Sequence, residues 1–553
     1  MTERSPPILP EPTPPTLEVL IVGAGFAGLY LMHRMRGAGL SAHIYEAADG
    51  VGGTWYWNRY PGARCDVESM QYSFGWDEAF QQEWKWTERF AGQPELLKYA
   101  NHITDRYDLR RHITFNTRIS AATYDEAAGT WQVQTEAGLA LSCRYFVMAT
   151  GCLSTARIPD FPGLKDFKGR TFHTGWWPHQ PIDFTGRRVA VVGTGSSAIQ
   201  SIPVIAEQAA HLTVFQRTPN FSIPTRNGPM DDEYEQWWKD GYAEKRVAAR
   251  RTRTGILNRQ SDQKASETPL DEQLKVYEAR WQTGGTSFMG SFSDIITNKS
   301  VNDIAAEFVR NKIRGLVKDP KVAELLCPTN HPIGTKRICV DSHYFETYNR
   351  PNVTLVDVRT APITGLTATG LAWGEGNHAE FDDIVFATGF DAMTGAMTRV
   401  DIKGRGGQTL KEKWEGGPLT YLGLMTAGFP SLFMITGPGS PSVLSNMIVS
   451  IEQHVDWITD CLVDMKARGM PSIEALPAAE NNWVAHVNEV AHRTLYPQAN
   501  SWYMGTNIPG KPQVFMPYIG GLDVYGDKCA EVVAKGYEGF RIATPAKVAQ
   551  AAE

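Results

Sequence analysis

Apolar residues recur along the chain in two similar units, each made of a short continuous run, a glycine-rich turn and a helical pattern. The first unit combines residues 17–22 with the turn GAGFAG, and the second combines residues 188–192 with GTGSSA. Short continuous apolar runs predict buried strands, and the 3.6-residue spacing after each turn predicts a helix. Further strands are predicted at 41–46, 144–148, 212–216, 353–356 and 383–386, and further helical segments at 231–250, 300–317 and 446–462. The sequence therefore predicts an α/β fold with two Rossmann-like dinucleotide-binding domains.

The first turn carries the residues that a dinucleotide needs. Gly23 permits the tight turn, Gly25 lets the backbone approach a pyrophosphate, and Gly28 lets helix and strand pack closely. Glu46 ends the next predicted strand, where a carboxylate can accept hydrogen bonds from a ribose 2′-hydroxyl. Because this acid disfavours a 2′-phosphate, the first site is predicted to bind FAD or NAD.

The second unit differs at the position that selects the cofactor. Its helix is predicted at 197–207, with a kink or shortening at Pro203, and its second strand ends at Arg217 and Thr218 instead of an acid. A guanidinium can pair with a 2′-phosphate through two hydrogen bonds. The second cofactor is therefore predicted to be NADP(H).

The order of these elements predicts how the domains are divided. Each of two strands is followed by the sequence ATG, at 149–151 and at 387–389, which resembles the two crossings of flavoproteins with two dinucleotide-binding domains. The predicted division is a disordered tail at 1–18, an FAD-binding domain at 19–152 and 389–553, an NADP-binding domain at 153–222 and 333–388, and a helical insertion at 223–332.

Composition narrows the class of partner. The net charge of −6 and the absence of long basic blocks argue against nucleic acid or an anionic membrane. The seven cysteines have no C-x-x-C spacing, so neither a disulfide framework nor a metal site is indicated, and a cytoplasmic location is expected. No membrane span is visible in the sequence.

Two nucleotide sites in one chain permit hydride transfer from NADPH to a flavin, and the next electron acceptor determines the function. Disulfide reductases of this architecture need a paired redox cysteine motif, which this sequence lacks. Dioxygen is the remaining common acceptor. The aromatic run GTWYWNRYPGARCDVES at 53–69 is able to wall a planar ring system, although a buried aromatic cluster is the alternative.

The stretch between the two units carries the pattern F-x-G-x-x-x-H-x-x-x-W-P at Phe167, Gly169, His173, Trp177 and Pro178. With GTGSSAIQS, FQRTPN, GTKR, GFDAMTG, GPGSPSVLSNM and SWYMG, this pattern resembles the type I Baeyer–Villiger monooxygenases, which depend on FAD and NADPH. The resemblance extends from about residue 19 over nearly all of the chain, and the subgroup that it resembles most is the phenylacetone and steroid monooxygenases.

The resemblance implies a role for each residue that matches a family motif. FAD would be bound by Gly23, Gly25, Gly28, Glu46, Thr54, Trp55, Tyr56, Trp57, Asp66, Tyr72 and Met447. NADP would be bound by Thr194, Gly195, Ser196, Ser197, Ala198, Ile199, Gln200, Arg217, Thr218, Lys336 and Trp502. Arg337 in GTKR would be the catalytic arginine with Asp66 as its partner, since a peroxide anion and an oxyanion both need a permanently charged donor.

The resemblance also implies the reaction. NADPH reduces FAD, oxygen adds at flavin carbon 4a, and the peroxide attacks a ketone to give an ester or lactone, NADP⁺ and water. Residues near Ser442, Val443, Leu444 and Met447 are expected to border the ketone. Two alternatives remain, an N- or S-oxidising flavin monooxygenase and a non-catalytic flavin-binding protein.

Several features are left open by the sequence. The ketone can be aromatic, cyclic or steroidal, and the oligomeric state is undetermined. His173 is interpreted as a structural residue in preference to a general base, and the stretch 167–178 as a hinge. The loop at 501–512 is interpreted as either a mobile cover or a static surface loop.

Overall fold

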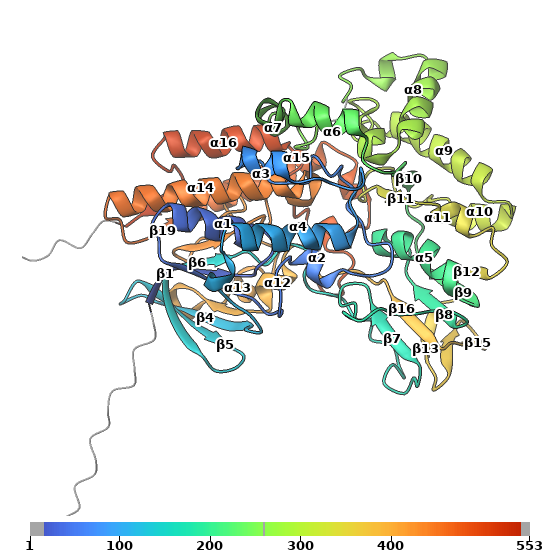
Figure 1. Cartoon of the computed structure of the whole chain (residues 1–553), viewed down its shortest axis with the longest axis horizontal. Coiled ribbons are helices and arrows are strands. Elements are labelled where there is room, and N and C mark those ends of the chain that lie inside the picture. The colour runs from blue at the N-terminus through green and yellow to red at the C-terminus, as the bar shows by residue number, and fades with distance from the viewer. Residues whose placement is uncertain (1–15, 258–259, 544–553) are drawn as a thin grey trace, which may run out of the picture.

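The computed structural model of the chain describes residues 16–257 and 260–543. In Figure 1 the first Rossmann-like domain lies on the left, the second at the lower right, and the helices α8 to α10 at the upper right. The predicted tail covers residues 1–18, of which the first 15 lie outside the described residues. The first strand begins within the predicted tail, at Thr16.

The first domain is built on an eight-stranded sheet with the order β17-β4-β5-β6-β1-β2-β3, and β18 pairs with the second half of β6. Its strands are β1 (Thr16–Val22), β2 (Ala42–Tyr45), β3 (Ile113–Thr114), β4 (Ile119–Asp125), β5 (Thr130–Thr135), β6 (Ala140–Met148), β17 (Asp401–Lys403) and β18 (Leu432–Met434). Along β1, Val19 and Ile21 pack into one apolar cluster, whereas Leu20 and Val22 pack into another. Since both faces of the strand are buried, its sequence is continuously apolar.

Helices from both ends of the chain belong to this domain. They are α1 (Phe26–Gly37), α2 (Thr54–Trp57), α3 (Glu78–Glu83), α4 (Gln93–Arg106), α12 (Gly395–Thr398), α13 (Leu410–Lys413), α14 (Met447–Ala467), α15 (Pro477–His492) and α16 (Leu522–Ala534). Two further short strands, β19 (Ile473–Ala475) and β20 (Phe540–Ile542), pair with each other in antiparallel orientation. The helices α1 and α14 lie against each other, which joins the first and last parts of the chain into one core (Figure 1).

The second domain contains an all-parallel sheet with the order β12-β9-β8-β16-β7. Its strands are β7 (Arg170–His173), β8 (Arg188–Val192), β9 (His211–Gln216), β12 (Val353–Asp357) and β16 (Asp383–Phe386), with α5 (Ser196–Gln208) and α11 (Tyr344–Thr347) beside them. An antiparallel sheet of β13 (Ile363–Leu366), β14 (Gly370–Trp373) and β15 (Asn377–Glu380) is attached. The edge strand β7 comes from the stretch interpreted as a hinge, so part of that stretch is built into the sheet.

The two connections between the domains run side by side. Ala156 and Phe390 form an antiparallel bridge, and the Arg157 N–H donates to the Gly389 carbonyl at 2.9 Å. These segments follow β6 and β16 together with their ATG sequences, as the two predicted crossings require. The two connections are therefore joined to each other by their backbones.

The helical insertion divides between the two cores. Its helices are α6 (Asp232–Lys239), α7 (Tyr242–Arg250), α8 (Leu270–Thr283), α9 (Lys299–Leu316) and α10 (Pro320–Leu326). The strands β10 (Ser222–Pro224) and β11 (Cys339–Asp341) pair in parallel at its base. Trp238 of α6 and Tyr242 of α7 pack into the first domain, whereas Tyr277 of α8 packs into the second. The segment that carries the insertion therefore also binds the two domains together.

Two helices differ from what the sequence predicts. The helix α5 continues through Pro203 to Gln208, although proline in a helix costs about 3 kcal/mol. Its side chains Ile199, Ile202 and Ile205 are fully buried, and this burial offsets the missing hydrogen bond. The predicted helical segment 231–250 is instead broken into α6 and α7 by Gly241, where φ is −166°.

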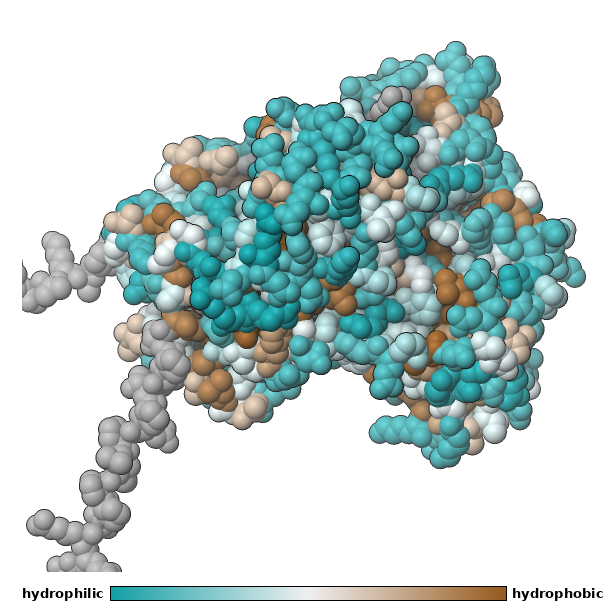
Figure 2. Space-filling view, in the orientation of Figure 1, coloured by the Kyte–Doolittle hydropathy of each residue, from teal (hydrophilic) through white to brown (hydrophobic). Residues whose placement is uncertain are grey.

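One face of the protein is mainly polar, and the cysteines lie inside the protein. The face shown in Figure 2 is mostly hydrophilic, with hydrophobic residues in small separate groups. All seven cysteines are buried and unpaired. Within the described residues no helix has the length and apolar character that crossing a bilayer requires.

The turn of the first domain generates a stability prediction. A Cβ at Gly28 would lie 1.9 Å from the Gly23 carbonyl oxygen, so Gly28→Ala must displace backbone. We expect a loss of about 3 kcal/mol in the free energy of unfolding and loss of bound flavin, measured by denaturant titration and flavin absorbance. Gly37→Ala is the matched control, because a Cβ there meets no atom within 4 Å. Equal stability of the two variants would contradict the close approach.

Candidate active site and cofactor sites

The turn after β1 leaves the start of α1 open. Gly23 has a φ of 106°, and a Cβ there would lie 2.8 Å from the Ala149 carbonyl oxygen. Gly25 precedes α1, and no side chain caps the helix. The first backbone N–H groups of α1 are therefore available to an anion, and the helix dipole favours negative charge there. This geometry fits a pyrophosphate.

Glu46 follows β2 and ties that strand to the turn. Its carboxylate accepts hydrogen bonds from the Ala24 N–H at 2.6 Å and the Ala48 N–H at 2.8 Å. Burial raises the pKa of Glu46, while these backbone donors lower it. A carboxylate has about four lone-pair sites, so Glu46 keeps acceptor capacity for a ribose hydroxyl.

The aromatic side chains of Trp55 and Tyr72 lie near the first turn. Trp55 of α2 donates its Nε1–H to the Tyr72 hydroxyl at 3.3 Å. The Asn446 side-chain amide donates to the Gln71 carbonyl at 2.8 Å, and Met447 begins α14 directly after it. The structure thus brings Met447 to the loop that carries Tyr72, although the two are far apart in sequence.

The remaining predicted residues of the aromatic run differ in their surroundings. Thr54, at the start of α2, is exposed and Trp57 is half-buried. Tyr56 is buried, and its hydroxyl donates to Asp49. Its ring contacts His179 at a centroid distance of 4.6 Å. Tyr56 therefore binds the first domain to the segment after the stretch 167–178.

The second turn, between β8 and α5, is open at the position where a phosphate would approach. A Cβ on Gly195 would meet no atom within 4 Å, and no side chain caps α5. The Thr194 hydroxyl donates to the Thr218 carbonyl at 2.8 Å, which holds the turn against the end of β9. Ala198 and Ile199 are fully buried, so they have only backbone groups to offer a ligand.

Gln200, expected at the NADP site, lies between the two domains. Its side-chain oxygen accepts from the Tyr60 hydroxyl at 2.9 Å, and its amide donates to the Arg64 carbonyl at 3.1 Å. The side chain therefore joins α5 to the loop that leads to Asp66. Ser196 and Ser197 lie in the first turn of α5, where their hydroxyls contact Cys339 Sγ at 3.1 Å and Thr174 Oγ1 at 3.0 Å.

Positive charge gathers where the second sheet ends. Arg217 follows β9 directly and is exposed. Burial, together with the charge of Arg217, lowers the pKa of Lys336 to about 8. Neither side chain forms an ion pair within residues 16–257 and 260–543. Two cations that repel each other fit a 2′-phosphate, because a dianion between them removes the repulsion.

Arg337 and Asp66 form an ion pair through two hydrogen bonds. The Arg337 Nε donates to Asp66 Oδ2 at 2.7 Å, and Nη2 donates to Oδ1 at 2.8 Å. Nη1 donates to the Val443 carbonyl at 2.6 Å. Burial lowers the pKa of Arg337, but the Asp66 charge and hydrogen bonds raise it well above its ordinary value. Since a guanidinium has about five N–H donors, donors remain for a ligand.

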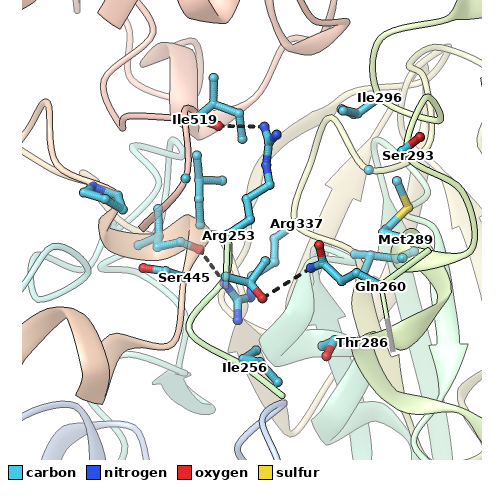
Figure 3. Close-up of a pocket in the computed structure, with 18 of the residues that line it drawn as sticks. Arg253, Ile256, Gln260, Thr286, Met289, Ser293, Ile296, Arg337, Ser445 and Ile519 are labelled. Atoms are coloured by element: carbon cyan, nitrogen blue, oxygen red, sulfur yellow. Dashed lines mark hydrogen bonds between the residues drawn. The ribbon is translucent and has the colours of Figure 1, made fainter. Parts of the chain in front are cut away.

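A cavity of about 430 Å³ opens beside Arg337 (Figure 3). In Figure 3, Met289 and Ile296 approach it from the insertion, and Ser445 lies on the opposite side. Val443 and Leu444 line this cavity, as expected from the sequence, together with Ile256, Phe292, Tyr496, Tyr503 and Ile519. Ser442 and Met447, expected nearby, are not among the residues that line it.

The loop at 501–512 is held down at several points. Trp502 and the buried Tyr503 lie in a short 3₁₀ helix, and Tyr503 lines the cavity. The Asn507 amide donates to the Phe390 carbonyl at 2.7 Å, and the Lys511 ammonium pairs with Asp391 at 2.6 Å. In this structure the loop is therefore packed against the second crossing segment.

His173 forms contacts through both ring nitrogens. Nδ1 accepts from the Gly175 N–H at 3.0 Å, and Nε2 lies 3.1 Å from the Arg157 carbonyl. Burial lowers its pKa, although the Arg157 hydrogen bond raises it. A neutral ring with an Nε2–H satisfies both contacts, so His173 fixes the first crossing segment.

Several residues that shape these sites belong to no sequence motif. Arg246 of α7 is buried and donates to the carbonyls of Met70 and Gln71 at 3.0 and 3.1 Å, which fixes the loop that carries Tyr72. Val443 contributes only its backbone carbonyl oxygen to Arg337. Such partners are far apart in the chain, so local spacing gives no indication of them.

The fold and these sites define a flavoprotein with two dinucleotide-binding domains. A family model described as flavin-binding monooxygenase-like matches residues 16–273. A Baeyer–Villiger monooxygenase of Pseudooceanicola batsensis is 41% identical over 94% of this chain and 95% of its own. A phenazine N-monooxygenase of Lysobacter antibioticus is 40% identical over 95% of this chain and 96% of its own.

The solved structures agree with this class. An oxidized steroid monooxygenase bound to NADP is 50% identical, with a TM-score of 0.92 over 96% of this chain and 100% of the other. The chain therefore belongs to the Baeyer–Villiger monooxygenases. Its cofactors are FAD and NADP(H).

The pKa of Lys336 generates a prediction about cofactor affinity. Lys336 is charged below its pKa of about 8 and neutral above it, so NADP⁺ affinity should fall as the pH rises. The bound phosphate raises this pKa again, so the fall is centred above that value. Titrations from about pH 7 to about pH 10 should show about a tenfold increase in Kd for NADP⁺ and none for NAD⁺. Lys336→Arg is the control, because it stays charged over this range; a similar pH dependence in this variant would contradict the assignment.

Proposed function

We propose that the ketone is bound in the cavity beside Arg337 and that Arg337 and Asp66 are the catalytic pair. The observation that supports this proposal most is the two-bond pair between them, with Arg337 lining the cavity. When bound, FAD and NADPH supply the electrons that activate dioxygen. One oxygen atom of the dioxygen enters the bond between the carbonyl carbon and its neighbour, giving an ester or lactone, and the other atom leaves as water.

Arg337 supplies a fixed positive charge to this reaction. Negative charge develops on the carbonyl oxygen of the ketone when it is attacked, and preorganised donors stabilise such charge without reorganising. Asp66 and the Val443 carbonyl fix three of the guanidinium N–H groups, so the remaining donors have a defined direction. Asp66 thus orients Arg337 and keeps it charged against the cost of burial.

The size and lining of the cavity bear on the class of ketone. On the insertion side Ile256, Met289, Phe292 and Ile296 supply apolar surface, which suits the hydrocarbon part of a ketone. Polar side chains lie on the same side, namely Gln260, Asp262, Thr286 and Ser293. A volume of about 430 Å³ fits an aromatic, cyclic or steroidal ketone. The similarity to the steroid monooxygenase supports including the larger ones.

N-oxidation is the second candidate activity, because a relative of 40% identity is a phenazine N-monooxygenase.

The cofactor sites are assigned as the resemblance implies: the open turn at Gly25 with Glu46 for FAD, and the turn at Gly195 with Arg217 and Lys336 for NADP(H). A reducing cytoplasmic location is part of the proposal, and the seven unpaired cysteines support it.

Turnover with labelled oxygen tests the proposed reaction. The holoenzyme is incubated with NADPH, ¹⁸O₂ and, in separate reactions, an aromatic, a cyclic and a steroidal ketone, and the products are analysed by mass spectrometry. We expect an ester or lactone that carries one ¹⁸O atom. A parallel reaction contains a heteroaromatic nitrogen compound. Labelled N-oxide without any ester from the ketones would contradict the proposal and favour N-oxidation.

The role of Arg337 is tested by separating reduction from oxygen insertion. Arg337→Ala should keep flavin reduction by NADPH, because reduction creates no charge on the ketone oxygen, and should lower ester formation by about 100-fold or more. Reduction is followed by anaerobic absorbance and ester formation by chromatography. Arg337→Lys keeps the charge but not the two-bond pairing with Asp66, so it should give an intermediate rate. Normal ester yield in Arg337→Ala would exclude Arg337 from the reaction.

A further inference from the structure

The backbone of Arg157 is fixed beside the carboxyl ends of the strands in the second sheet. Its N–H donates to the Gly389 carbonyl at 2.9 Å. Its carbonyl accepts from the Thr388 hydroxyl at 2.6 Å and lies 3.1 Å from the His173 Nε2. Thr388 follows β16, so these bonds place Arg157 at the carboxyl end of the parallel strands. In open α/β sheets, ligands bind at this end.

The Arg157 side chain lies between the crossing segments and the loop at 501–512. It is half-buried, and its Nη1 donates to the Asn507 carbonyl. The Asn507 amide is itself bound to the Phe390 carbonyl at 2.7 Å. No carboxylate pairs with Arg157 among residues 16–257 and 260–543. Most of its five N–H donors are thus left without a protein acceptor.

The charge that acts on Arg157 is positive, and Asp160, three residues further along the chain, forms no ion pair with it. Burial lowers the pKa of Arg157, and so does the charge of Arg217. Arg217 acts in the same way on Lys336. The nearest acid along the second crossing segment is Asp391, and it is paired with Lys511 at 2.6 Å. Arg217 therefore repels both Arg157 and Lys336, and an anion between such cations removes the repulsion.

We propose that Arg157 is a third cationic group of the NADP(H) site and binds the 2′-phosphate together with Arg217 and Lys336. This inference rests on the proposed assignment of the second nucleotide site. A phosphate dianion has enough acceptor oxygens for all three side chains, and a guanidinium binds such oxygens in pairs. Because the same guanidinium touches the Asn507 carbonyl, a bound 2′-phosphate would lie beside the loop at 501–512.

Binding measurements without turnover test this role. Dissociation constants for NADP⁺, NAD⁺ and adenosine 2′,5′-bisphosphate are measured with the oxidised FAD-bound protein, by calorimetry or flavin fluorescence. Arg157→Ala should raise Kd for NADP⁺ and for the bisphosphate by about tenfold and leave Kd for NAD⁺ unchanged. Arg217→Ala is the reference for loss of one cation. Arg157→Lys should recover part of the affinity, since it restores the charge without the guanidinium fork.

Arg188→Ala is the control, because Arg188 begins the central strand β8 and so lies at the amino end of the parallel strands, away from the proposed site. It should bind all three ligands like the unmodified protein. Flavin absorbance and the melting temperature establish that each variant is folded. Unchanged NADP⁺ affinity in Arg157→Ala, or equal losses for NADP⁺ and NAD⁺, would overturn the proposal.

The outcome is independent of the oxidation reaction, because no ketone or oxygen is consumed. If the unmodified protein binds NADP⁺ tightly but yields no ester, the proposed function fails while the role of Arg157 can still be measured. If Arg217→Ala and Arg157→Ala both leave NADP⁺ binding unaltered, the site assignment and the inference fail together. If only Arg217→Ala weakens NADP⁺, the inference fails alone.

Discussion

The ion pair between Arg337 and Asp66 is the contact on which the arrangement of the active site depends. Its members are 271 positions apart in the chain. Asp66 belongs to the first domain, and Arg337 lies where the chain leaves the insertion. Leaving either half-buried charge unpaired costs free energy, so the ion pair holds the two segments together. The Val443 carbonyl adds a third segment, from the C-terminal part of the first domain.

Other contacts across the interface support the same arrangement. Gln200 joins α5 to the backbone of Arg64, two residues before Asp66. Arg246 and Asn446 both bind the backbone of the loop that carries Tyr72, one from the insertion and one from the start of α14. The cavity beside Arg337 is therefore bounded by segments whose relative positions are set by buried polar contacts. Buried hydrogen bonds of this kind are specific because leaving either partner unpaired costs free energy.

The two nucleotide sites differ in the charge of the residue that follows their second strand. The first strand-turn-helix unit ends in an acid, Glu46, whose carboxylate is bound to backbone N–H groups. The second ends in Arg217, and burial and mutual repulsion perturb the cations around it. The same local fold thus presents opposite charge to its ligand, and this difference suits one site to a ribose hydroxyl and the other to a phosphate.

The sequence by itself determined the two strand-turn-helix units, the ATG segments after β6 and β16, and the family motifs. These features depend on neighbours within about 30 residues, because strand and helix periodicity and glycine turns are local. Only the tertiary structure decided how the insertion divides between two cores, that the predicted hinge contributes the edge strand β7, and that Gln200 faces Arg64. It also decided which side chains surround Arg337. Those outcomes depend on contacts between segments hundreds of residues apart, and the energy of such contacts comes from burial and pairing that no local pattern records.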